Sequence, residues 1–123
     1  MARCILIVDD SAFARRKLQQ AFEGADYRIE EAASGLEALE KYSLQRPDIV
    51  LLDLVMEGMD GLAVLAQLRA LDPEANIIVA TADVQTATRD EVLRLGACAV
   101  VNKPFQSEEL LAAVRRVAER AAP

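Results

Sequence analysis

Residues 49–53 read Ile-Val-Leu-Leu-Asp, four apolar residues followed at once by a carboxylate. A short run without polar residues is typical of a strand that is covered on both faces. Similar runs recur along the chain, and longer segments with helical periodicity separate them. We expect strands at residues 4–8, 28–32, 49–52, 77–80 and 99–101. Strands that alternate with helices predict an α/β fold built on a parallel sheet.

The segments between and after these runs are expected to be helices that cover the sheet. We expect them at residues 12–23, 35–45, 61–71, 86–95 and 108–120. In the last one, Leu110, Val114 and Val117 recur at i+3 and i+4 spacing, so one apolar stripe faces the sheet. The second strand contains Arg28 and Glu30, and this polarity favours a place at the edge of the sheet.

Length and composition fit one domain, because the 123 residues are 53% hydrophobic and 28% charged. The net charge of -6 argues against a nucleic-acid partner, since phosphate contacts need clustered Lys and Arg. The apolar runs are far shorter than the ~20 residues of a membrane helix. The N-terminus has no signal peptide pattern, so we expect a cytoplasmic protein that contacts no membrane. The chain has no histidine, which excludes a mechanism that needs an internal imidazole.

Polar residues follow four of the five expected strands. In an open α/β sheet, the ligand site lies beyond the carboxyl ends of the strands. The residues found at these ends are Asp9 and Asp10, Asp53, Thr81 and Lys103. The second strand ends in small residues and offers nothing comparable. If the strand order is 2-1-3-4-5, the four polar ends are neighbours and their side chains converge.

Three carboxylates that converge need positive charge nearby. Each pair repels by about 4 kcal/mol at ~4 Å and an effective dielectric constant near 20. Carboxylate oxygens suit Mg²⁺ or Mn²⁺, and the ammonium of Lys103 adds a mobile charge. An ionised Asp53 could then attack phosphorus without a general base. The hydroxyl of Thr81 and the backbone N–H of Ala82 are two donors for phosphoryl oxygens.

Each of these residues, taken alone, also has a structural interpretation. Residues 9–11 read Asp-Asp-Ser and could cap a helix. Asp53 could end a strand at a turn, and Thr81 could be an ordinary strand-end residue. Lys103 is harder to explain in this way, because a lysine that ends an apolar strand has little packing value. The arginines at 115, 116 and 120 fit a solvated helix face, with partner binding as the alternative.

Five short motifs, taken in order, resemble the receiver domain of response regulators, including stand-alone receivers of the chemotaxis type. They are Val8-Asp9-Asp10-Ser11, Leu51-Leu52-Asp53, Met59-Asp60-Gly61, Thr81-Ala82 and Lys103-Pro104-Phe105. The resemblance covers essentially the whole chain, so residues 1–123 are expected to form a single receiver domain. It implies a flavodoxin-like, doubly wound (βα)5 fold whose five-stranded parallel sheet has the order 2-1-3-4-5.

The resemblance also implies the roles of the acidic residues. Asp53 would accept a phosphoryl group from a sensor histidine kinase or a histidine phosphotransfer protein. Asp9, Asp10 and Asp53 would hold Mg²⁺ or Mn²⁺ together with the backbone carbonyl of Val55. The protein would be a phosphoacceptor that promotes its own phosphorylation and dephosphorylation, and not an enzyme with a separate substrate.

Further expectations concern the phosphoryl group and the partners. Thr81, Ala82 and Lys103 would bind the phosphoryl group, and the peptide bond before Pro104 would be cis. We expect a monomer that passes its signal to an effector protein, whose identity the sequence does not give. A relay or phosphate-sink role is the alternative to an output switch.

Three features depart from the usual pattern of the family. Val100 occupies the place, three residues before the lysine, where an aromatic residue usually reports phosphorylation. Glu57 replaces a proline that commonly follows the acceptor by four positions. The two positions that influence dephosphorylation in the family are Val55 and Asp83, and an acidic Asp83 could either orient an attacking water or repel the phosphoryl donor.

The expected topology also bears on the cysteines and on other functions. Cys4 and Cys98 would lie three strand spacings apart, ~14 Å, whereas a disulfide needs Cα atoms within about 7 Å. A phosphatase or phosphotransferase of the haloacid dehalogenase type also forms a phosphoaspartate, but it carries Asp-x-Asp, whereas Asp9 and Asp10 are adjacent. A flavin-binding protein of similar fold would need a phosphate-cradling loop that follows the first strand, and this chain has none.

Overall fold

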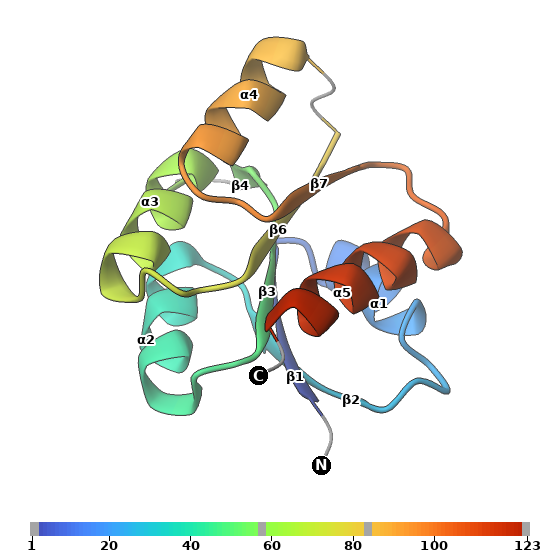
Figure 1. The fold of residues 1–123 in the computed structure, drawn as a ribbon. Coiled ribbons are helices and arrows are strands. Elements are labelled where there is room, and N and C mark those ends of the chain that lie inside the picture. Colours follow the sequence, from blue (N-terminus) through green and yellow to red (C-terminus); the bar gives the residue numbers. More distant parts are fainter. Residues whose placement is uncertain (1–2, 57–58, 83–84, 122–123) are drawn as a thin grey trace.

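A five-stranded parallel sheet forms the centre of the computed structural model, which describes residues 3–56, 59–82 and 85–121 (Figure 1). Its strands are β1 (Arg3–Val8), β2 (Tyr27–Ala32), β3 (Ile49–Leu52), β6 (Ile77–Thr81) and β7 (Ala99–Asn102). They lie in the order β2-β1-β3-β6-β7, which is 2-1-3-4-5 when only this sheet is counted. The predicted strands, their order and the edge position of β2 are confirmed.

Helices cover both faces of the sheet. They are α1 (Ala12–Gln20), α2 (Gly35–Gln45), α3 (Gly61–Leu71), α4 (Thr86–Arg94) and α5 (Ser107–Ala121). Figure 1 shows α1 and α5 together on one face and α2 and α3 on the other. Among the described helices, none combines the length and the apolar character that a membrane crossing requires.

The core consists of two hydrophobic clusters, one on each face of the sheet. Successive strand residues point to opposite faces, so Val50 and Leu52 join the cluster under α2 and α3. Ile49 and Leu51 join the cluster under α1 and α5, where Leu110 is also buried. This division explains why residues 49–52 are continuously apolar, since each face of the strand is buried.

The first helix ends three residues earlier than predicted. Ala21, Phe22 and Glu23 continue from it as a turn, in which each backbone N–H donates to the carbonyl three residues before it at 2.9 to 3.2 Å. Such i+3 bonds tighten the last turn and end the helix. Phe22 is nevertheless buried, in the hydrophobic cluster that α5 also joins.

A short antiparallel pair, β4 (Val55–Met56) with β5 (Met59–Asp60), was not predicted. The pair lies between β3 and α3, and the Asp60 side chain caps α3 by accepting the N–H of Leu62 at 2.9 Å. Gly61 packs so closely that a Cβ there would lie 2.4 Å from the Cα of Leu54. The motif at 59–61 is therefore structural: it returns the chain tightly to the segment that follows Asp53.

Candidate functional site

Three acidic side chains meet where β1 and β3 end. Carboxylate oxygens of Asp9, Asp10 and Asp53 lie within 4.8 Å of one another. Asp9 and Asp53 are buried, whereas Asp10 is exposed. The register of the sheet brings Asp9 and Asp53 together. Val8 pairs with Leu52 in the parallel ladder, and an aspartate directly follows each of these two strand ends.

Backbone hydrogen bonds fix both buried aspartates at the end of the sheet. The N–H of Asp53 donates to the carbonyl of Val8 at 3.0 Å, and the N–H of Asp9 donates to that of Ala32 at 3.1 Å. The carboxylate of Asp9 also accepts the N–H of Ser11 at 3.0 Å. Ser11 itself caps α1 through its side chain. The triplet at 9–11 thus contains a helix cap and two members of the acidic cluster.

The ammonium of Lys103 lies among these carboxylates. Its Nζ is 2.9 Å from Oδ2 of Asp9 and 3.8 Å from Oδ2 of Asp53. Its backbone N–H donates to the carbonyl of Thr81 at 2.8 Å, which ties the lysine to the end of β6. The peptide bond to Pro104 is cis, as the family resemblance implied. The lysine, which follows β7, therefore links the acidic cluster to the ends of β6 and β7.

The environment of Asp53 opposes its ionisation. Burial is the main cause of a raised pKa, and the charge of Asp9 adds to it, with a smaller effect of Asp10. The ammonium of Lys103 lowers the pKa, as does the N–H of Val55, which donates to Asp53 at 3.3 Å. The causes that raise the pKa outweigh those that lower it, and a bound cation would add positive charge that favours the ionised form of Asp53.

The donor set fits a hard divalent cation. Three carboxylates outnumber the single ammonium of Lys103, which leaves the cluster with excess negative charge. Oxygen ligands of this kind suit Mg²⁺ and Mn²⁺ and do not suit a metal that prefers thiolate or imidazole. The cluster at Asp9, Asp10 and Asp53 can hold such a cation.

Other predicted site residues border this cluster. Thr81 is buried at the end of β6, and the exposed Ala82 follows it. Val55 begins β4 and approaches Asp53 through its N–H, while its carbonyl as a metal ligand stays a prediction. Glu57 and Asp83 lie outside the described residues, so their predicted effects stay predictions too.

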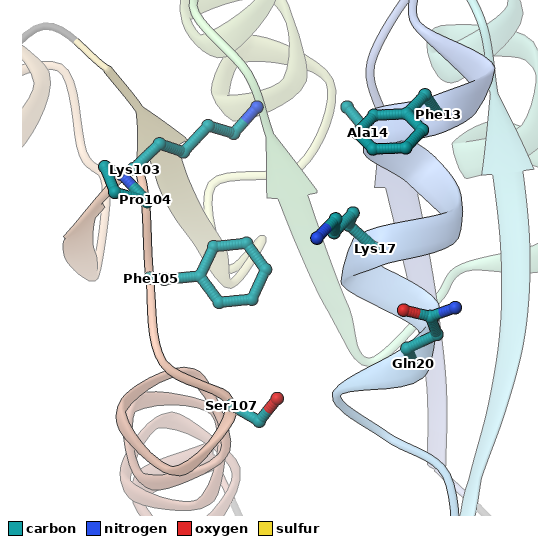
Figure 2. A pocket seen from close by; sticks show the side chains of 8 residues that line it. All are labelled: Phe13, Ala14, Lys17, Gln20, Lys103, Pro104, Phe105 and Ser107. Carbon is teal, nitrogen blue, oxygen red and sulfur yellow. The ribbon is translucent and has the colours of Figure 1, made fainter.

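Two features of the site were missed in the sequence. Arg15 of α1 donates from Nη1 to the backbone carbonyl of Asp9 at 2.7 Å. A hollow of about 390 Å³ also opens between α1 and the segment that follows β7, and Lys103 lines it together with Phe13 and Phe105 (Figure 2). Phe13 is 71% exposed in the structure, and its position two residues after Ser11 gave no sign of the hollow in the sequence.

The two cysteines take no part in the site. Both are free thiols, as predicted, and Cys4 is buried whereas Cys98 is partly exposed. The sulfur of Cys98 contacts the side-chain oxygen of Asn76 at 3.8 Å.

Comparison with known proteins gives one consistent family. Residues 5–115 match the model of the response regulator receiver domain. The chemotaxis protein CheY of Listeria monocytogenes is 40% identical over 116 residues, which are 94% of this chain and 98% of that protein. CheY of Thermotoga maritima is 38% identical over 120 residues, or 97% and 100% of the two chains.

Solved structures agree. A CheY-like receiver domain from Methanospirillum hungatei superposes with a TM-score of 0.92 at 26% identity and covers 98% of this chain and 97% of its own. A chain of the CheX-CheY complex with BeF₃ and Mg²⁺ from Borrelia burgdorferi gives 0.90 at 34% identity, with coverage of 94% and 88%. The chain therefore belongs to the family of response regulator receiver domains.

Proposed function

We propose that residues 1–123 form one receiver domain that accepts a phosphoryl group on Asp53 in a reaction that needs a divalent cation. The observation that carries the proposal is the position of Asp53: it is buried at the end of β3, beside Asp9 and Asp10, and Lys103 Nζ is 3.8 Å away. A structural strand-end aspartate has no need of such surroundings. Membership of the receiver family supports the same role.

The reaction is an in-line substitution at phosphorus. A carboxylate oxygen of Asp53 attacks the phosphorus of a phosphohistidine, the phosphorus–nitrogen bond breaks, and its electron pair stays on the imidazole nitrogen. No proton has to leave Asp53, because the reacting form is already ionised. Mg²⁺ or Mn²⁺, held by Asp9, Asp10, Asp53 and the carbonyl of Val55, would supply positive charge to the phosphoryl oxygens.

The remaining residues would receive the phosphoryl group. Lys103 can turn from the carboxylates to a phosphoryl oxygen, since its ammonium is a compact charge on a flexible stem. The hydroxyl of Thr81 and the N–H of Ala82, at the end of β6, are donors for the other oxygens. Attack of water on phosphorus would release phosphate and restore Asp53, which ends the signal.

The phosphohistidine must come from outside these 123 residues, because they contain no histidine. We propose a sensor histidine kinase or a histidine phosphotransfer protein, and a cytoplasmic reaction. The hollow in Figure 2 is the surface on which we propose that this donor docks. Its apolar surface comes from Phe13, Pro104 and Phe105, and Lys17 adds a positive charge beside them. Because Lys103 lines the same hollow, a donor that docks there lies next to the acidic cluster.

A second surface supports binding of an effector. The solved complex from Borrelia burgdorferi joins a CheY to CheX, and we propose that this chain likewise contacts a downstream protein. Between α4 and α5, β7 borders a hollow of about 250 Å³. Its lining includes Val100, and its charged residues are three arginines and one acid, namely Arg89, Arg116, Arg120 and Glu109. Positive side chains on a chain with a net charge of -6 favour an acidic segment of the partner.

Phosphorylation by a small phosphodonor tests the proposal without the partner kinase. The parent protein, incubated with Mg²⁺ and acetyl phosphate, is expected to gain one phosphoryl group by intact mass, and chelation of the cation should abolish the gain. Asp53→Asn should gain none. Asp48→Asn removes an aspartate from the opposite end of β3 and should behave like the parent. A parent protein that gains no phosphoryl group would contradict the proposal.

A further inference from the structure

Arg15 contacts the acidic cluster through the main chain and not through a carboxylate of the cluster. Its Nη1 donates to the backbone carbonyl of Asp9 at 2.7 Å, and its Nε donates to Oε1 of Glu31 at 2.9 Å. The arginine side chain is only 16% exposed. One guanidinium therefore links the loop that carries Asp9 and Asp10 to β2, the edge strand of the sheet.

We propose that Arg15 is a positioning residue of the cation site, which sets Asp9 and Asp10 in the arrangement that a divalent cation needs. The inference rests on the proposed function, because it requires the acidic cluster to bind Mg²⁺. The carbonyl that Arg15 holds belongs to the peptide bond between the two aspartates, and that bond is planar. Fixing this oxygen fixes the plane from which both aspartates extend.

Asp9 has further restraints besides the hydrogen bond from Arg15 to its carbonyl. The N–H of Asp9 is bonded to Ala32, and its carboxylate is bonded to the N–H of Ser11 and to Lys103. Asp10 is exposed at the start of the loop. The restrained peptide joins Asp9 to Asp10, so the bond from Arg15 also helps to set the backbone from which the Asp10 carboxylate enters the cluster.

The guanidinium group suits this position because it is planar and presents several N–H donors in a fixed geometry. Two of these donors are used on two different elements, the loop after β1 and the side chain of Glu31 on β2. Glu31 is held in turn through its backbone carbonyl, which accepts a hydrogen bond from Lys41 of α2. A lysine at position 15 would present its donors from a single nitrogen and would lack the fixed, separated donors with which Arg15 binds the two acceptors.

Charge alone predicts the opposite effect on metal affinity. An arginine near a cation repels it, so removal of the positive charge should strengthen Mg²⁺ binding. Positioning predicts that removal of Arg15 weakens binding. Arg16 is the matched control: it is the next residue of α1, its side chain is exposed, and it makes no ion pair with another described residue.

Calorimetric titration of the full chain with Mg²⁺ separates the two effects. Arg15→Met is expected to weaken Mg²⁺ binding by roughly ten- to a hundredfold, the usual effect of losing a partner behind the metal ligands. Arg16→Met should bind as tightly as the parent or slightly more tightly. Arg15→Lys should recover part of the affinity. Equal affinities of Arg15→Met and Arg16→Met, or tighter binding by Arg15→Met, would overturn the inference.

Phosphorylation by acetyl phosphate gives a second readout. Arg15→Met should need more Mg²⁺ for half of its maximal rate and yet approach the parent rate at saturating Mg²⁺, since Asp53 and Lys103 are unchanged. A lower rate at every Mg²⁺ concentration would contradict positioning. If the parent binds Mg²⁺ but is not phosphorylated, the proposed function fails, while the titration still decides the role of Arg15.

A folding defect is controlled separately. Thermal unfolding of the metal-free variants, followed by circular dichroism, sets a temperature at which all of them are folded for the titration. If Arg15→Met does not fold, Glu31→Met provides the test, because it removes the anchor of Arg15 and leaves the arginine in place. It should weaken Mg²⁺ binding less than tenfold but measurably, and unchanged binding in that variant would overturn the proposal.

Discussion

Asp53→Asn should stabilise the metal-free protein. The carboxylates of Asp53, Asp9 and Asp10 lie within 4.8 Å of one another, so each pair repels by about 3.5 kcal/mol at an effective dielectric constant near 20. Lys103, at 3.8 Å from Asp53, offsets about 4.4 kcal/mol of this. Asp10 is exposed, and solvent weakens its share. We therefore expect the free energy of unfolding to rise by about 1 to 2 kcal/mol.

Urea unfolding at neutral pH in the presence of a chelator measures this change. The midpoint of Asp53→Asn should exceed that of the parent, with a similar slope. Asp48→Asn is the control for the change in net charge. The carboxylate of Asp48 accepts the N–H of Cys4 at 2.6 Å and lies outside the cluster, so this substitution should not stabilise. An Asp53→Asn midpoint at or below that of the parent would refute the reasoning, as would equal stabilisation by Asp48→Asn.

The pH dependence of the same difference gives a check on its sign. Burial, Asp9 and Asp10 raise the pKa of Asp53 in the folded protein above its ordinary value. The folded state therefore binds the proton more tightly than the unfolded state. The resulting stability is fully present below the unfolded pKa and is lost as the pH rises through the folded pKa. The advantage of Asp53→Asn should thus shrink as the pH falls through the raised folded pKa of Asp53 and be gone below the ordinary pKa of an aspartate.

Two further substitutions and one pH series test the structure. Tyr42→Phe removes the hydrogen bond from a buried hydroxyl to Asp72 at 2.7 Å and should lower the free energy of unfolding by about 1 kcal/mol, measured by urea unfolding. Gly61→Ala places a Cβ against the backbone of Leu54, so it should lower the free energy of unfolding by about 1 to 3 kcal/mol. It should also slow the phosphorylation of Asp53 by acetyl phosphate. A phosphorylation rate equal to that of the parent would contradict the tight contact. At limiting Mg²⁺, the phosphorylation rate should fall as the pH falls through the raised pKa of Asp53, because only the ionised carboxylate attacks; a rate independent of pH would contradict this.

Most strands of the sheet were predictable because they are short, continuously apolar runs in the sequence. Every residue of 49–52 is buried, and a run that is apolar on both faces has few alternatives to a covered strand. The strand order itself came from the family resemblance, because apolar runs do not specify which neighbours pair. The meeting of Asp9 with Asp53 follows once β1 and β3 pair in register, so this part of the site depended on that order.

The features that were missed depend on contacts that a residue pattern does not show. Arg15 bonds to a backbone carbonyl, and every residue carries such an acceptor, so the sequence did not single it out. The pair β4 and β5 contains two residues in each strand, too few for a period of two to be recognised. The hollow of Figure 2 is formed by α1 and by residues about ninety positions later, which only the fold brings together.

Folding stability and phosphorylation are linked through the same cluster of charges. A cation that binds only the folded state stabilises it by about 2.7 kcal/mol at a hundred times its dissociation constant. This exceeds the net destabilisation of about 1 to 2 kcal/mol that we assign to the charge of Asp53. Phosphorylation would add a charge of roughly -1.5 to -2 at that residue. The nearest ammonium, Lys103, is bonded to Thr81 through its backbone and lines the hollow beside Phe105. If Asp53 is phosphorylated, Lys103 is therefore the residue through which the new charge first acts on both the end of β6 and the surface beside α1.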